Sequence, residues 1–262
     1  MIRTIATGAA RAILRPAPRA RKLAPLRAVV RLPGVFDLAS LTMQAIDLAR
    51  LRRIGSTFSV KGDYMRQVHD YNASVSLKKT ITFTRRAEIH YEMLTGSPPR
   101  RVDGESLLVV GPRNRHELLM AWCHGYGWDR ISAIDLYSTN PKIQVMNMEK
   151  MSFPAASFDA VAMAHTLAYS SDCDVAIGEV ARVLRPGGRF AFGAAYEPVN
   201  DQWKGNRVPA QQLVDRMHDL DMEVVGHLAY DKTNGLGFRQ TTHAFVARKR
   251  LDGESRLDPF RL

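Results

Sequence analysis

Cysteine is scarce in this sequence, and the two cysteines do not form a disulfide or metal-binding pattern. Only Cys123 and Cys173 occur among 262 residues, and neither belongs to a CxxC pair or a Cys/His cluster. We therefore expect no disulfide framework and no metal site. Two isolated thiols are typical of a reducing compartment, so a cytoplasmic location is the simplest expectation.

Long apolar runs are also missing. No stretch approaches the roughly 18 consecutive apolar residues that a transmembrane helix needs, so no transmembrane segment is predicted. Apolar residues nevertheless make up 45% of the chain and charged residues 24%, an ordinary balance for a globular protein with a sizeable core.

Acidic residues are absent from the first 36 positions, which hold eight basic residues and four prolines. Residues 1–100 carry 18 basic and 6 acidic side chains, a net charge of +12, whereas residues 101–262 carry 19 and 20, a net charge of −1. Three interpretations of residues 1–36 stay open: a solvated basic arm, a mitochondrial-type targeting segment, or an arm that rests on an anionic membrane surface, a nucleic acid or a protein partner. The second would imply a mitochondrial location.

Helical periodicity begins after this arm. Asp37 is a candidate N-cap for a helix that reaches Ile54, and one apolar face is expected to be buried. A second helix is predicted from Thr84 to Leu94, before the Pro- and Gly-rich stretch 95–105. We therefore predict a basic arm (1–36), a helical extension (37–100), an α/β domain (101–250) and a polar tail (251–262). The predicted inward residues of the first helix are Leu38, Leu41, Ala45, Leu48 and Leu51.

Strand and helix patterns alternate from residue 106 onward, which is typical of a doubly wound, mostly parallel α/β sheet. Expected strands cover 106–111, 130–135, 159–164, 189–195, 222–230 and 242–249, and expected helices cover 115–124, 173–184 and 210–221. Val175 is expected among the core contacts of the helix 173–184. In such sheets ligands bind beyond the carboxyl ends of the strands.

Glycine is rare at the loop where nucleotide-binding folds usually have several. The first strand is followed by Gly111-Pro112-Arg113-Asn114-Arg115. Either arginine would have to point away from a bound cofactor, toward a carboxylate or phosphate, or else fill the cofactor pocket. Asp135 ends the next strand 24 residues after Gly111, near the spacing of about 20 residues that is usual for a ribose-binding acid.

Four segments in order resemble the class I S-adenosylmethionine-dependent methyltransferases of the small-molecule type, with a divergent, glycine-poor first motif. They are "SLLVVGPRNRHELL" (106–119), "AIDLYS" (133–138), "NMEKMSFPAASFDAVAMAHTLAY" (147–169) and "EVARVLRPGGRFAFG" (179–193). The resemblance implies a seven-stranded Rossmann-like fold behind a basic, largely helical N-terminal extension.

The same resemblance implies S-adenosylmethionine as the cofactor and assigns its contacts. Gly111 and Arg113 would lie near its methionine and ribose, Asp135 would bind the ribose hydroxyls, and Leu136 would pack on the adenine. Asn147 and Met148 would lie beside the adenine amine. His165 would face the reacting methyl as a general base, although a structural histidine is an equal alternative. Weaker candidates for an acceptor pocket are Tyr169, Tyr196 and Trp203.

Two functions from different classes remain open. One is transfer of a methyl group to a hydroxyl of a small molecule or glycan; nothing resembles the Asn-Pro-Pro-Tyr signature, which disfavours amide or base nitrogen as the acceptor. The other is an inactive methyltransferase fold that serves as a scaffold or assembly partner through its basic arm. The glycine-poor loop favours the scaffold, whereas Asp135 and His165 favour the enzyme.

Overall fold

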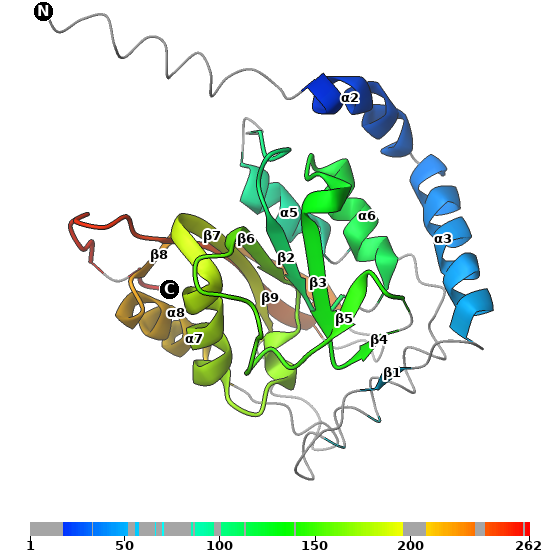
Figure 1. The fold of residues 1–262 in the computed structure, drawn as a ribbon. Helices are drawn as coiled ribbons and strands as arrows, with labels where there is room; N and C mark the ends of the chain where they lie inside the picture. Colours follow the sequence, from blue (N-terminus) through cyan, green and yellow to red (C-terminus); the bar gives the residue numbers. More distant parts are fainter. Residues whose placement is uncertain are drawn as a thin grey trace, which may run out of the picture.

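A seven-stranded sheet forms the centre of the molecule (Figure 1). The structure is a computed structural model that describes residues 18–32, 34–51, 56–57, 66, 70, 85, 87–96, 101–112, 114–138, 140–195, 208–233, 239–258 and 260–262. The strand order is β5-β3-β2-β6-β7-β9-β8. Neighbouring strands from β5 to β7 pair in parallel, and β9 is antiparallel to both β7 and β8. The predicted doubly wound, mostly parallel sheet is confirmed.

The strands have the lengths that the apolar runs indicate. All four residues of the central strand β2 are buried, because helices cover both faces of the sheet. The bounds are β2 Leu107–Val110, β3 Ile131–Asp135, β5 Ile143–Val145, β6 Phe158–Met163, β7 Leu184–Ala195, β8 Met222–Thr233 and β9 Arg239–Lys249. A separate two-stranded sheet pairs β1 Ser56–Thr57 with β4 Tyr137–Ser138.

Helices flank the sheet in two layers, each with its own apolar cluster. Helices α5 (Glu88–Thr95) and α6 (Arg115–Cys123) pack on one face, while α7 (Cys173–Val183) and α8 (Ala210–Asp219) pack on the other. Alternate residues of β2 divide between them, since Leu107 and Val109 face the first layer and Leu108 and Val110 the second. Two short 3-10 helices, η1 (Trp128–Arg130) and η2 (Leu167–Tyr169), complete the connections.

Helix α7 begins directly after its N-cap residue, Asp172. The Asp172 carboxylate accepts hydrogen bonds from the backbone N–H groups of Asp174 and Val175, which satisfies two free donors of the first turn. Ile177, Val180 and Leu184 are buried as expected. The expectation for Val175 was wrong: its side chain is 46% exposed, because it lies two residues before the buried Ile177, about 200° away around the helix, and therefore on the outer side.

The Pro-Gly-Gly run bulges out of β7 as an irregular loop. Leu184 pairs with Phe158 and the next pair is Arg189 with Ala160, so the intervening residues leave the ladder. Gly188 is required there, since a Cβ atom would lie 2.8 Å from the Arg185 carbonyl oxygen. Arg185 in turn donates to Asp159 at 2.7 Å. Burial raises the pKa of Asp159, but hydrogen bonds from Ser106 and Arg185 outweigh that effect and leave its pKa below the ordinary value.

The two N-terminal helices, α2 (Pro18–Val30) and α3 (Val35–Leu51), lie outside α6 and form the outermost layer on that side (Figure 1). The expected N-cap was wrong, because α3 begins at Val35 and Asp37 lies in its first turn. The expected burial of Leu38 and Ala45 was wrong, since Leu38 is 65% exposed and Ala45 is exposed as well, whereas Ser40, Gln44 and Asp47 are buried with Phe36. Leu41 is half-buried, and the side chains of Leu48 and Leu51 lie outside the described part of the structure. The cause is the polar start of α6, which faces α3 and requires polar partners.

Helix α5 starts later than the predicted Thr84 and ends one residue after Leu94. Its Tyr91 and Leu94 share one apolar cluster with Leu107 and Val109 of β2. The described residues on the two sides of the predicted boundary at residue 100 therefore share a core. The C-terminal tail also contacts this domain, since Gln211 of α8 donates to the Phe260 carbonyl at 3.1 Å and accepts from the Leu262 N–H at 3.0 Å.

Candidate functional site

A small cavity opens where β2 and β3 end, beside the point at which the strand order reverses between β2 and β6. Its volume is about 30 Å³. Its lining includes every predicted cofactor residue that the structure describes, together with Tyr169. The lining residues are Val110, Gly111, Ile134, Asp135, Leu136, Met146, Asn147, Met148, Thr166 and Tyr169.

Backbone hydrogen bonds fix the carboxyl ends of these strands. The Gly111 N–H donates to the Ile134 carbonyl at 2.8 Å, and the Met146 N–H donates to the Asp135 carbonyl at 2.9 Å. Gly111 has a φ of +71°, a conformation that only glycine adopts without strain. Asp135, the last residue of β3, is half-buried and presents a carboxylate at the edge of the cavity.

Asn147 and Met148 follow β5 in a turn that their own side chains stabilise. The Asn147 Oδ1 atom accepts a hydrogen bond from the Glu149 N–H at 2.9 Å. The Glu149 carboxylate accepts from the backbone and hydroxyl of Ser171, just before α7. Asn147 therefore has one oxygen lone pair committed to its turn and a second that can still accept.

Thr166 contributes to the cavity in a way that the sequence did not predict. A Cβ atom built on Gly111 would lie 2.2 Å from the Thr166 Cγ2 atom, so the threonine side chain fills the space above the glycine. The Thr166 hydroxyl lies 3.3 Å from the Ala164 carbonyl oxygen, to which it donates. Its position directly after the β6 strand, at the switch point of the sheet, was the available signal.

His165 lies beside the cavity but does not line it. The residue has a φ of +56°, and its ring packs edge-on against His90 with 5.5 Å between ring centroids. Its Nδ1 atom is 3.0 Å from the position a Gly193 Cβ atom would take, so glycine at 193 is what admits the ring. The proposed general-base role of His165 stays a prediction, and His90, a buried neighbour from α5, is a residue that the sequence did not single out.

Arg115 does not point into the cavity. Its Nε atom donates to Asp47 Oδ2 at 2.8 Å, its Nη2 lies 2.8 Å from Asp47 Oδ1, and Nη2 also donates to the Met43 carbonyl at 3.0 Å. The guanidinium thus makes a bidentate pair with a carboxylate that is 2% exposed. The sequence left open whether this arginine pairs with an anionic group or fills the cofactor pocket, and in the structure Arg115 pairs with a carboxylate. Arg113, Tyr196 and Trp203 lie outside the described residues.

The Arg115–Asp47 pair belongs to a buried polar network between α3 and the start of α6. Asn140 donates to Asp47 Oδ1 at 2.6 Å. The Ser40 hydroxyl and His116 Nδ1 are 2.5 Å apart, and Gln44 donates to Ser40 at 2.8 Å. Asn114, the N-cap of α6, accepts from the His116 N–H and donates to Gln44. The loop that begins at Gly111 is therefore attached to α3, and the spacing of Ser40, Gln44 and Asp47 was the signal for it.

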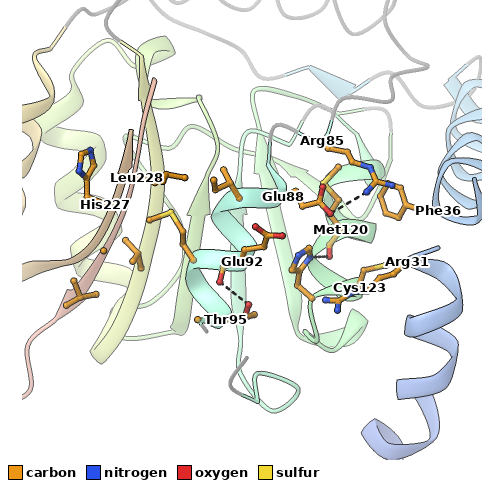
Figure 2. Close-up of a pocket in the computed structure, with 17 residues that line it drawn as sticks. Arg31, Phe36, Arg85, Glu88, Glu92, Thr95, Met120, Cys123, His227 and Leu228 are labelled. Atoms are coloured by element: carbon orange, nitrogen blue, oxygen red, sulfur yellow. Dashed lines mark hydrogen bonds and ion pairs between the residues drawn. The ribbon is translucent and has the colours of Figure 1, made fainter. Parts of the chain in front are cut away.

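A larger groove of about 890 Å³ runs along α5, from Arg31 and Phe36 on one side to β8 on the other (Figure 2). It shares no lining residue with the small cavity. Glu88, Glu92 and His124 come together in it with their ligand atoms within 4.8 Å of one another. Arg85 lies 3.5 Å from Glu88 and already compensates part of this charge. Burial lowers the pKa of His124 and raises that of the Cys123 thiol to about 11.

Comparisons with known proteins agree with this geometry. Residues 127–192 match the family described as a methyltransferase domain. A 95-residue segment is 39% identical to the ubiquinone/menaquinone biosynthesis C-methyltransferase UbiE of Hahella chejuensis. That segment covers 36% of this chain and 31% of the relative, so the chain spans about a third of that protein's length.

The α/β core has the fold of the class I S-adenosylmethionine-dependent methyltransferases, and residues 127–192 match a methyltransferase domain. Solved structures agree on the methyltransferase fold. A 1,6-didemethyltoxoflavin N1-methyltransferase of Burkholderia thailandensis, with bound S-adenosylhomocysteine, has a TM-score of 0.56 at 13% identity and covers 75% of this chain and 95% of its own. The N-methyltransferase NodS of Bradyrhizobium japonicum WM9, also with S-adenosylhomocysteine, has a TM-score of 0.53 at 16% identity and covers 72% and 99%.

Proposed function

We propose that this protein is an S-adenosylmethionine-dependent methyltransferase that acts on a small-molecule acceptor. The observation that carries the proposal is the convergence of Gly111, Asp135, Leu136, Asn147 and Met148 on one cavity at the switch point of the sheet. These residues come from three separate loops, and a methyltransferase of this family places its cofactor at that edge.

The donor set fits the adenosine part of the cofactor. The Asp135 carboxylate can accept from two ribose hydroxyls, and Asn147 keeps an oxygen lone pair for the adenine amine. Leu136 and Met148 are buried apolar side chains at the same edge and suit the faces of a purine. The methionine part needs space over Gly111, which Thr166 fills, so binding requires the threonine side chain to turn away.

The cofactor, when bound, supplies an electrophilic methyl group on a sulfonium. The chain's own residues would then do three things. Asp135 and Asn147 hold the nucleoside, Gly111 lets the backbone approach the ligand closely, and the ordered turn at Asn147 fixes the orientation of both. An oxygen acceptor would form its bond to carbon while the carbon–sulfur bond breaks toward sulfur, and its proton would pass to a base, for which His165 remains our candidate.

Two acceptor atoms are considered, a hydroxyl oxygen and a ring carbon. The histidine beyond β6 and the missing Asn-Pro-Pro-Tyr signature favour a hydroxyl oxygen. The relationship to a C-methyltransferase of quinone biosynthesis favours a ring carbon of a quinol, which loses its ring proton after the carbon–carbon bond forms. Both reactions release one proton, from the hydroxyl oxygen or from the ring carbon, so both need a base beside the acceptor.

The proposal is tested by incubating the full chain with methyl-labelled S-adenosylmethionine and a panel of alkyl phenols, quinols and glycosides. Labelled product is expected, and its position on oxygen or carbon decides between the acceptors. Absence of cofactor binding by calorimetry, with a well-folded protein, would overturn the proposal. That result would favour the scaffold alternative, which the small cavity of about 30 Å³ supports.

Thr166→Ala is expected to tighten cofactor binding by about three- to tenfold. The reason is steric, since turning a side chain out of a preferred rotamer costs about 0.5–1.5 kcal/mol, and alanine removes that cost. Calorimetric titration with S-adenosylmethionine measures the change. Thr166→Val is the matched control, because it keeps the volume and removes the hydroxyl; it should bind no better than the unchanged protein. Equal affinities of the alanine variant and the unchanged protein would show that Thr166 does not obstruct the site.

A further inference from the structure

Helix α3 has its apolar side facing solvent. The residues that it buries are Phe36, Ser40, Gln44 and Asp47, three of them polar. Successive residues of a helix are 100° apart, so the exposed residues fall on the opposite side of α3. These exposed residues are Val35, Leu38, Thr42, Ala45, Ile46 and Ala49.

Among the residues of α3 whose side chains the structure describes, none of the exposed ones on that side is charged. Thr42 adds little polarity, because its hydroxyl donates to the Leu38 carbonyl at 2.8 Å. A soluble surface helix normally has the reverse pattern, with apolar residues inward and charged residues outward.

The exposed apolar side continues onto α2. Leu26, Val29 and Leu32 are each about half exposed, while Arg27 anchors the helix inward by donating to the Tyr126 carbonyl at 3.0 Å. Six of the twelve exposed large apolar residues in the described part of the chain fall between positions 26 and 46. We call this surface the α2–α3 face: Leu26, Val29, Leu32, Val35, Leu38 and Ile46. A concentrated apolar surface of this kind marks an interaction site.

Charge indicates what this surface meets. The first 36 residues contain eight basic residues and no acid, and Arg31 is exposed beside Leu32. Aliphatic side chains next to arginines suit the boundary between lipid headgroups and acyl chains, where anionic lipid attracts the cations. A nucleic-acid surface would instead be expected to combine basic with aromatic or polar side chains.

The geometry favours a surface position over a membrane span. Among the described residues no single helix is long and apolar enough to cross a membrane, although Leu23–Val30 and Val35–Asp47 pass that test of length and composition together. The two segments are bent by 93° relative to each other between Val30 and Val35, and both helices contact α6. The pair can therefore present its outer side to a bilayer without leaving the domain.

We propose that the α2–α3 face binds the surface of an anionic phospholipid bilayer, with its aliphatic side chains among the acyl chains and the exposed Arg31 beside the headgroups. This inference does not depend on which acceptor is methylated. It also uses no residue of the cofactor cavity, so the two proposals can fail separately.

The test is sedimentation of the full chain with phosphatidylcholine vesicles, with and without phosphatidylglycerol. Binding is expected to be about tenfold stronger with the anionic lipid, and raised salt should reduce the difference. Leu26→Glu with Leu38→Glu should weaken binding at least about tenfold, since two charges enter the apolar side. Val175→Glu with Leu257→Glu is the control, because it adds the same charge at two other exposed apolar residues and should leave binding unchanged. Melting temperatures verify that both double variants fold.

Three results would overturn the proposal. The first is no sedimentation with either vesicle, and the second is an equal loss in the control variant. The third is evidence that the face binds a different partner. The chain would then self-associate with rising concentration or bind a synthetic RNA duplex, the Leu26→Glu and Leu38→Glu changes would abolish that binding, and vesicles would remain unbound.

Discussion

Replacing Asp47 by alanine is expected to lower the free energy of unfolding by about 3–5 kcal/mol, the usual cost of removing one partner from a buried ion pair. The Asp47 carboxylate is 2% exposed and its partner Arg115 is 16% exposed, so the remaining guanidinium would stay buried without its counterion. Asn140 would lose its acceptor as well. Denaturant unfolding followed by circular dichroism measures the change.

Asp37→Ala is the matched control on the same helix. Asp37 lies in the first turn of α3, where removing an acid should cost no more than about 1 kcal/mol. If Asp47→Ala prevents folding, the double variant Asp47→Leu with Arg115→Met removes both charges and is expected to be more stable than the single one. Equal stability of the Asp47→Ala and Asp37→Ala variants would show that the pair does not hold α3 to α6.

Asp135→Ala is expected to weaken S-adenosylmethionine binding by about 10²-fold or more. Two hydrogen bonds to a carboxylate contribute about 1.5–3 kcal/mol each, and every 1.4 kcal/mol corresponds to a factor of ten in affinity. The carboxylate ends β3 at the edge of the cavity, where no other acidic side chain is among the lining residues that the structure describes. Calorimetric titration of the purified chain gives the affinity.

Two variants make this result specific. Asp135→Asn keeps the shape and one acceptor oxygen and should lose less affinity than alanine. Asp129→Ala removes an acid from η1, which is not part of the cavity lining, and should leave the affinity unchanged. An Asp135→Ala protein that melts normally and binds as tightly as the unchanged one would refute the assignment of the ribose site.

Most of the α/β core could be predicted from the sequence, because its signals are local. A short, wholly apolar run such as Leu107–Val110 predicts a strand covered on both faces, and the structure has that strand. The carboxyl ends of parallel strands meet at one edge, so Asp135 and Asn147 had to approach Gly111 once the strand order was known.

The predictions of which side chains are buried failed where the side that meets the protein depends on distant segments. The leucines of α3 have helical spacing, but spacing identifies an apolar side and not which side meets the protein. Val175 failed for the same reason within α7. The role of His165, which rests on its place after a strand, stays a prediction, and in the structure the neighbouring Thr166 lines the cavity.

The sequence by itself determined the order of strands and helices, the family resemblance and the residues that gather at the carboxyl ends of the strands. The reason is that periodicity, turn residues and strand ends can be recognised within short stretches of sequence. Only the tertiary structure decided the direction of Arg115. Its partner Asp47 is 68 residues away in the sequence. A guanidinium pairs with whichever carboxylate the folded chain brings within about 3 Å, and the local sequence does not specify that carboxylate. The same contact turned the polar side of α3 inward and left its apolar side free for a partner.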